Sequence, residues 1–185
     1  MTKVEGVDKF STLASGTAVK KRTDAPTNLR MLIVDDQIMN RKLMQRKFKS
    51  GVFKELKWEV ETANTGEECL SMMQVKTFDF VVIDENMHEG GGILTGTETT
   101  VKIRALVGQR RVLIFGCTGN CTEEDKQKSV ASGQDAFWEK PAPLAERALA
   151  EITRLWNDNY AGSPESTESR TSSTKSPPAV SPPSP

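Results

Sequence analysis

The chain has 185 residues, and its 25 basic side chains are matched by 25 acidic ones, so its formal net charge at pH 7 is zero. The middle of the chain, residues 31–160, is mildly acidic, which argues against a nucleic-acid-binding surface. No stretch approaches the ~20 apolar residues that cross a bilayer, and the start lacks the pattern of a secretory signal. We therefore expect a soluble protein of the cytoplasm or nucleus, with neither nucleic acid nor membrane as a partner.

The composition divides the chain into three parts. Residues 1–28 show no hydrophobic periodicity, and residues 159–185 are rich in Ser and Pro, so both are predicted to be disordered. Residues 29–158 are long enough for one folded domain. The tail holds four Ser-Pro pairs that suit proline-directed kinases, which favours a eukaryotic source; a plain low-complexity linker is the alternative reading.

Short apolar runs alternate with amphipathic stretches through the predicted domain. The runs, which predict strands, are 29–34 (LRMLIV), 58–62 (WEVET), 78–83 (FDFVVI), 112–117 (VLIFGC) and 136–138 (AFW). Helices are predicted near 37–50, 66–75, 96–107, 122–132 and 143–157. This alternation predicts an α/β fold, a doubly wound five-stranded parallel sheet of flavodoxin-like order 2-1-3-4-5 with five helices.

Local signals mark some helix ends. Thr65-x-x-Glu68 and Thr122-x-x-Asp125 have the pattern of capping boxes, and Gly133 is placed to end the fourth helix. In the last helix, an apolar stripe is predicted at helical spacing, formed by Leu144, Ala148, Ile152 and Leu155.

Polar residues follow the apolar runs where the strands are predicted to end. Asp35 and Asp36 follow the first run, Asp84 the third, Thr118 the fourth and Lys140 the fifth. Carboxyl ends of parallel strands share one edge of the sheet, so these side chains are expected to converge there. Two carboxylates about 4 Å apart repel by roughly 4 kcal/mol at an effective dielectric of about 20. An all-oxygen donor set calls for a hard cation, and Mg²⁺ is the predicted cofactor.

Each residue has an ordinary structural reading when it is taken alone. An Asp-Asp pair after a strand is commonly a helix N-cap, Thr118 can simply end a strand, and Lys140-Pro141 can simply be a turn. Their joint occurrence, in order and each at its own strand end, favours a functional site.

The same segments carry a family resemblance. LIVDDQIMNRKLMQRKF (32–48), FVVIDENM (80–87), CTGN (117–120) and SGQDAFWEKP (132–141) resemble response-regulator receiver domains of two-component and phosphorelay signalling, in particular the receivers of hybrid histidine kinases. The resemblance covers residues 29–157. It implies a phosphoprotein that accepts a phosphoryl group from a histidine kinase or a histidine phosphotransfer protein and then signals to a downstream protein that the sequence does not identify.

The resemblance also implies a role for each matching residue. Asp84 would be the phosphoacceptor, and Lys140 and Thr118 would contact the phosphoryl group together with the Gly119 N–H. Phe137 would be the switch aromatic, and the Lys140-Pro141 bond would be cis. The implied metal ligands are Asp35 (through water), Asp36, Asp84 and the backbone carbonyl of Asn86.

The sequence departs from the family after Asp84. The usual Met-Pro is Met87-His88, and the loop that follows is longer by about four residues and contains Gly90, Gly91 and Gly92. The three glycines predict a mobile loop that alters partner choice or water access. His88 is the only histidine and is predicted to be an ordinary loop residue, so the chain itself carries no histidine-kinase core and no phosphotransfer histidine.

Three alternatives remain at this point. A receiver-fold interaction module that no longer uses phosphate predicts loss of acidic or basic site residues, and none is lost. A phosphatase of the haloacid dehalogenase type requires aspartates two positions apart, whereas Asp35 and Asp36 are adjacent. Zinc binding by Cys117 and Cys121 is disfavoured against reduced thiols, since no further Cys or His has suitable spacing. We therefore expect a regulator that catalyses only its own phosphorylation and dephosphorylation, whether it acts alone or within a hybrid kinase.

Overall fold

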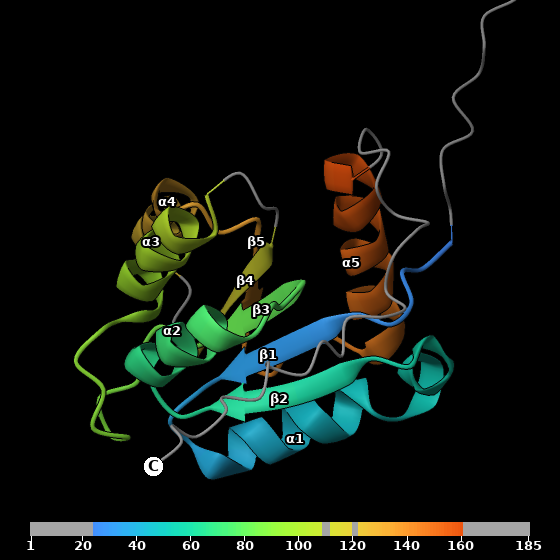
Figure 1. Ribbon diagram of the computed structural model, residues 1–185, viewed down its shortest axis with the longest axis horizontal. Helices are drawn as coiled ribbons and strands as arrows, with labels where there is room; N and C mark the ends of the chain where they lie inside the picture. Colours follow the sequence, from blue (N-terminus) through green and yellow to red (C-terminus); the bar gives the residue numbers. More distant parts are fainter. Residues whose placement is uncertain (1–23, 109–111, 120–121, 161–185) are drawn as a thin grey trace, which may run out of the picture.

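The computed structural model describes residues 24–108, 112–119 and 122–160. They form one sheet in the order β2-β1-β3-β4-β5, in which every pair of neighbouring strands is parallel (Figure 1). The strands are β1 (Arg30–Val34), β2 (Glu59–Ala63), β3 (Phe80–Ile83), β4 (Leu113–Thr118) and β5 (Ala136–Glu139). The predicted fold class and strand order are confirmed.

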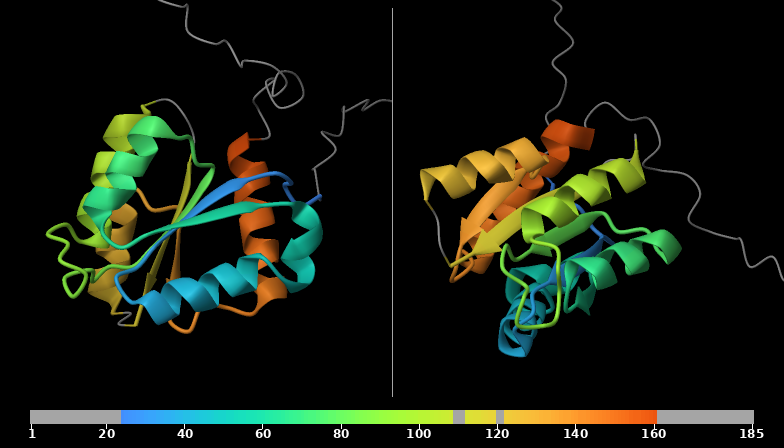
Figure 2. Two further views of the ribbon diagram at one scale, coloured as in Figure 1. Left: turned by 60° about the horizontal axis from the view of Figure 1, so that its bottom comes forward. Right: turned by 90° about the vertical axis from the view of Figure 1, so that its left-hand side faces the viewer.

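Helices follow each strand and cover both faces of the sheet. They are α1 (Ile38–Phe48), α2 (Gly66–Val75), α3 (Gly96–Val107), α4 (Glu123–Ser132) and α5 (Ala145–Tyr160), with a 3₁₀ helix η1 (Gly51–Leu56) after α1. Figures 1 and 2 show α1 and α5 on one side of the sheet and α2, α3 and α4 on the other. The five helices were expected, but η1 was not, because six residues are too few for a periodic pattern.

Side-chain caps fix where several helices begin. Thr122 and Asp125 form the predicted capping box of α4, and Gly133 ends that helix with φ +93°. Thr65 caps α2 by accepting from the Glu68 backbone N–H, whereas the Glu68 carboxylate accepts from Asn64 N instead of completing a box.

The two faces of the sheet bury separate apolar clusters. Alternate strand residues point to opposite faces, so Met31 and Ile33 of β1 pack with α1 and α5, and Leu32 and Val34 pack with α2 and α3. Nearly every residue of β1, β3 and β4 is buried, which explains their continuous apolar sequences.

Aromatic rings dominate the face covered by α1 and α5. Phe48 lies at the end of α1. The distance from its ring centroid to that of the neighbouring ring is 4.7 Å for Phe53, 6.0 Å for Trp58, 6.1 Å for Phe80 and 6.4 Å for Trp138. The cluster joins α1, η1, β3, β5 and Trp58, the residue before β2, so it fixes the end of α1 against the sheet.

The ends of the domain depart in part from expectation. Trp58 Nε1 donates to the Pro26 carbonyl at 2.8 Å, so contacts reach three residues before the predicted start at 29. In α5, Ala148 and Ile152 are fully buried and Leu155 is partly buried, as the stripe predicts. Leu144 is 80% exposed because it precedes the helix, so its place in the stripe was wrong. Most of the predicted disorder, at residues 1–23 and 161–185, lies outside the described residues, whereas Asn159 and Tyr160 belong to α5.

The aromatic cluster predicts a large effect of one truncation. Phe48→Ala should lower the free energy of unfolding by about 3–5 kcal/mol, because it leaves a cavity among four rings. Urea denaturation followed by tryptophan fluorescence measures this loss. On the same helix, Leu43 is 62% exposed, so Leu43→Ala should change stability by less than about 0.5 kcal/mol. A similar loss in both variants would contradict the packing role of Phe48.

Candidate functional site

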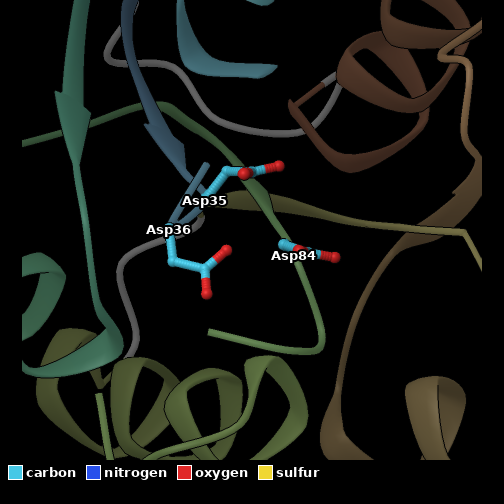
Figure 3. A group of neighbouring side chains, drawn as sticks. All are labelled: Asp35, Asp36 and Asp84. Carbon is cyan, nitrogen blue, oxygen red and sulfur yellow. The ribbon is translucent and has the colours of Figure 1, made fainter. Parts of the chain in front are cut away.

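Three carboxylates meet where β1 and β3 end. Ligand atoms of Asp35, Asp36 and Asp84 all lie within 4.8 Å of one another, and the side chains gather at one edge of the sheet (Figure 3). The parallel pairing of β1 with β3 brings them together, since Val34 is in register with Ile83 and the aspartates follow directly. Asp35 and Asp84 are buried, whereas Asp36 is partly exposed. The structure thus brings together the acids that the sequence predicts to converge.

Lys140 supplies the balancing positive charge. Its Nζ lies 2.7 Å from Asp35 Oδ2 and 2.8 Å from Asp84 Oδ2. Burial lowers the pKa of Lys140, but the hydrogen bonds and charges of Asp35 and Asp84 outweigh it, so the net shift is upward. Burial raises the pKa of Asp84 to about 6, despite the opposing hydrogen bond and charge of Lys140. At neutral pH the ammonium is therefore protonated and most of the Asp84 carboxylate is ionised.

Backbone and side-chain donors hold Asp35 in place. Its Oδ1 accepts from Gln37 N at 2.9 Å and from Asn40 Nδ2 at 3.1 Å. Arg41 of α1 donates to the backbone carbonyls of Asp35 and Asp36 at 2.5 and 2.9 Å. The first turns of α1 thus fix the segment that carries both acids, which gives Asn40 and Arg41 a positioning role.

The segment around Lys140 is anchored from two sides. The Lys140 N–H donates to the Thr118 carbonyl at 2.8 Å, and the Lys140-Pro141 bond is cis, as expected. On the other side, Lys47 Nζ donates to the Ala142 and Pro143 carbonyls, each at 2.8 Å. These contacts join the end of α1, the end of β4 and the loop after β5.

Thr118 and Phe137 occupy the neighbouring strand ends. Thr118, the last residue of β4, is buried, whereas Gly119 after it is exposed. Phe137 of β5 is half-buried, and a Cβ on Gly116 would lie 3.0 Å from its ring. The glycine therefore provides the space that the ring occupies. Asn86 is exposed two residues after Asp84, and its carbonyl remains a predicted ligand.

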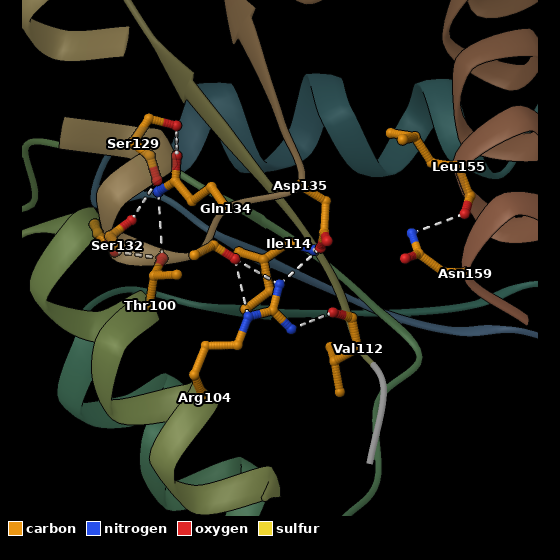
Figure 4. A network of polar contacts seen from close by, with 12 residues as sticks. Thr100, Arg104, Val112, Ile114, Ser129, Ser132, Gln134, Asp135, Leu155 and Asn159 are labelled. Carbon is orange, nitrogen blue, oxygen red and sulfur yellow. Dashed lines mark hydrogen bonds and ion pairs between the residues drawn. The ribbon is translucent and has the colours of Figure 1, made fainter. Parts of the chain in front are cut away.

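A polar network fastens α3 to the start of β5 (Figure 4). Arg104 donates to the Gly133 and Val112 carbonyls and pairs with Asp135 at 2.7 Å, and the same Asp135 oxygen accepts from Ile114 N. Next to it, the buried Gln134 accepts from Ser129 Oγ of α4 and donates to Thr100 Oγ1 of α3. Sequence patterns did not indicate this network, because its partners lie on different elements.

The loop after β3 lies against the acidic cluster. Glu89 N and Gly90 N donate to Asp36 Oδ2 at 2.9 and 3.2 Å. Ile93 N and Leu94 N donate to Glu67 Oε1 of α2 at 3.0 and 2.9 Å. The sequence predicted a mobile loop, but the structure gives the glycines a geometric reason, since a Cβ on Gly90 would lie 2.8 Å from Asp36 Cβ. Glu67 was missed, because an acid in the first turn of a helix has an ordinary role at its N-terminus.

The remaining thiols and His88 have ordinary surroundings. Burial raises the pKa of Cys69 and of Cys117 to about 12, so both thiols stay protonated. His88 Nδ1 lies 3.2 Å from the Gly92 carbonyl, within its own loop. Cys121 lies outside the described residues.

The donor set suits a hard divalent cation. All three acids offer carboxylate oxygens, Asp36 is partly exposed to solvent, and the three negative charges exceed the single charge of Lys140. Mg²⁺ prefers a few carboxylates and keeps several waters, so the residues fit it. Asp36 and Asp84 are the candidate direct ligands, and Asp35, whose oxygens already accept three hydrogen bonds, suits a contact through water.

In sequence, the chain is similar to parts of sensor histidine kinases. The chain is 31% identical over 124 residues to sensor histidine kinase RcsC of Salmonella typhimurium, which covers 67% of this chain but only 12% of that protein. Over 118 residues it is 30% identical to hybrid signal transduction histidine kinase A of Dictyostelium discoideum, covering 62% of this chain and 5% of the kinase.

Solved structures give the same picture of the fold. A CheY-like response regulator receiver domain protein from Methanospirillum hungatei has a TM-score of 0.61 at 25% identity, covering 74% of this chain and all of that one. The chemotaxis protein CheY4 of Vibrio cholerae has a TM-score of 0.59 at 28% identity, covering 70% of this chain and 99% of its own.

Within the described residues, no helix is long and apolar enough to cross a membrane. The response regulator receiver domain family matches residues 31–153, a stretch that holds the sheet from the second residue of β1 onward and all of the site. Receiver domains are not kinases, and related ones are built into hybrid histidine kinases. The chain belongs to the response regulator receiver domain family of two-component signalling.

Proposed function

We propose that this receiver accepts a phosphoryl group on Asp84, in a Mg²⁺-dependent reaction, from a phosphohistidine of a kinase or phosphotransfer protein. One observation carries the proposal: the Lys140 ammonium joins Asp84 and Asp35 at 2.8 and 2.7 Å, beside the third carboxylate. Phosphoryl transfer depends mainly on positioning and charge neutralisation. The site offers an ionised nucleophile, a fixed cation and oxygen ligands for a metal.

The proposed reaction forms one bond and breaks another. An Asp84 carboxylate oxygen attacks the phosphorus in line, the P–N bond to the donor histidine breaks, and its electron pair stays on the imidazole. Lys140 turns to a phosphoryl oxygen and offsets the charge that gathers there. Bound Mg²⁺ supplies further charge neutralisation and orients the phosphoryl oxygens. The product is an acyl phosphate, and its later attack by water completes the domain's own dephosphorylation.

The proposed output is a rearrangement near β4 and β5. The phosphoryl group would draw the Thr118 hydroxyl and the Gly119 N–H toward it, and Phe137 would turn into the space that Thr118 leaves. The ring already lies next to Gly116, where an added Cβ would come within 3.0 Å of it. The face of α4 and β5 would then present a different surface to a downstream protein, which is a population shift between two packings.

Helix α1 is the proposed docking surface for the donor. Ile38, Met39 and Leu43 are between 55% and 62% exposed, on the helix that begins three residues after Asp35. The helix carries no acidic residue, and Lys42 and Arg46 are exposed beside the apolar side chains. This face suits a partner with an apolar and acidic surface around its phosphohistidine.

We infer that the receiver works in the cytoplasm or nucleus and that its Ser-Pro-rich tail is a eukaryotic feature. A phosphorylation-independent interaction module is the alternative function, and it would leave the charged cluster without a use.

Asp84 should be the residue that gains phosphate. Incubation with acetyl phosphate and Mg²⁺ should add the mass of one phosphoryl group to the wild-type protein and none to Asp84→Asn, because the amide is not a nucleophile. Intact-protein mass spectrometry measures the gain, and omission of Mg²⁺ should abolish it. Asp79→Asn is the matched control and should gain phosphate as the wild type does. Asp79 lies just before β3, at the end of the strand opposite to Asp84, where it accepts from Arg30 N at 2.9 Å. No gain in the wild type with any donor would favour the interaction module.

The α1 surface should matter for a protein donor only. Leu43→Glu should slow phosphotransfer from a phosphorylated histidine phosphotransfer protein by about tenfold, a loss of about 1.4 kcal/mol. The rate with acetyl phosphate should not change, because a small donor needs no docking surface. Val130→Glu on α4, where Val130 is 73% exposed, is the control that should leave both rates unchanged. An equal slowing with both donors would assign the effect of Leu43→Glu to the site and not to docking.

A further inference from the structure

The loop from His88 to Thr95 is bound to the acidic cluster through one carboxylate oxygen. Asp36 Oδ2 accepts both the Glu89 and the Gly90 N–H, whereas Asp36 Oδ1 has no hydrogen bond from the part of the chain that the structure describes. A carboxylate held at one oxygen by two backbone donors cannot rotate freely. The other oxygen is therefore left for a ligand of the cluster.

Glu67 holds the far end of the same loop. Its Oε1 accepts from both Ile93 N and Leu94 N, and its Oε2 is buried without a hydrogen-bond partner among the described residues. Hydrogen bonds from its own backbone N–H and then from Leu94 and Ile93 lower the pKa of Glu67. The carboxylate is thus ionised and committed to the loop.

The glycines allow the loop to lie this close. A Cβ on Gly90 would lie 2.8 Å from Asp36 Cβ and 3.2 Å from the Asn64 carbonyl, and one on Gly92 would lie 2.9 Å from the Met87 carbonyl. Gly91 between them has φ +81°, a conformation that favours glycine. Each glycine therefore meets a geometric need of the docked loop.

We propose that the loop His88–Thr95, anchored by Glu67, is a clamp that orients Asp36 for Mg²⁺. The inference rests on the proposed function, because it assigns the metal to the same acids. The loop's N–H groups fix Oδ2, so Oδ1 meets the metal without first losing rotational freedom. Groups that orient a metal ligand typically change metal affinity about 10–100-fold when they are lost. The loop and Glu67 are positioning elements, and neither is expected to touch the reacting atoms.

The proposed coupling between loop docking and Mg²⁺ binding acts in both directions. If the docked loop favours Mg²⁺ binding, bound Mg²⁺ must favour the docked loop by the same factor. The Glu89 and Gly90 amides would then exchange their hydrogens more slowly when Mg²⁺ is present, since opening the loop would release both.

The experiment compares Mg²⁺ affinity between loop variants by isothermal titration calorimetry. Gly90→Ala should weaken Mg²⁺ binding about tenfold, because its methyl group pushes the loop away from Asp36. Ile93→Ala is the matched control in the same loop. The Ile93 side chain is 82% exposed, so the Mg²⁺ affinity of this variant should stay within about twofold of wild type. Hydrogen exchange followed by NMR should show Mg²⁺-dependent protection of the Glu89 and Gly90 amides in the wild type and not in Gly90→Ala.

A second pair of variants tests the anchor without changing any residue near Asp36. Glu67→Ala should weaken Mg²⁺ binding severalfold. Glu67→Gln should keep most of the wild-type Mg²⁺ affinity, because the amide oxygen still accepts from Ile93 N and Leu94 N. A urea midpoint close to that of wild type shows that each variant is folded.

The outcomes separate this inference from the proposed function. Equal Mg²⁺ affinity in wild type, Gly90→Ala and Glu67→Ala would overturn the clamp and leave the phosphoacceptor assignment intact. No Mg²⁺ binding by the wild-type protein would overturn the metal-dependent function, and the clamp with it.

Discussion

The site depends on three like charges held at one edge of a parallel sheet. Asp35, Asp36 and Asp84 approach within 4.8 Å, a separation at which each pair of carboxylates repels by a few kcal/mol. Lys140 offsets part of this repulsion through its contacts with Asp35 and Asp84, whereas the Asp36 carboxylate accepts two backbone N–H groups from the described part of the chain. The arrangement retains a deficit of positive charge. A divalent cation is the ligand that such an incomplete balance favours.

The surrounding fold holds these charged side chains close together despite their repulsion. The strands that carry the acids are buried on both faces, so they cannot shift without breaking two apolar clusters. Around them, Arg41 holds the segment after β1, Lys47 holds the loop after β5, and Arg104 holds the start of β5. All three are cations that donate to backbone carbonyls. Their charge therefore stabilises loops near the site without competing directly with Lys140 for the carboxylates.

The sequence predicts the fold and the cluster well because both follow from local patterns. Asp35 and Asp84 each come directly after an apolar run, and the order of the runs implies that they meet. The wrong and missed predictions concern residues whose surroundings depend on contacts between segments far apart in the sequence. Leu144 has the spacing of the α5 stripe but precedes the helix, and Glu67 has an ordinary N-terminal role until the loop is seen to dock on it. Three consecutive glycines indicate freedom in a sequence, whereas Gly90 is needed here because the backbone lies against Asp36.

In the proposed reaction, Lys140 would have to leave Asp35 or Asp84 to contact the phosphoryl group, and the donors around Asp35 indicate which carboxylate can lose the ammonium at less cost. As an acyl phosphate, Asp84 would carry no negative charge at the attacking oxygen, and the phosphoryl oxygens would then be the stronger partners for the ammonium. Asp35 keeps the Gln37 N–H and Asn40 Nδ2 as hydrogen-bond donors. Its buried carboxylate is therefore still hydrogen-bonded after Lys140 turns away, which avoids the several kcal/mol that an unpaired buried charge costs. The first turn of α1 thus makes the resting ion pair exchangeable, and an exchangeable ion pair is what a reversible switch requires.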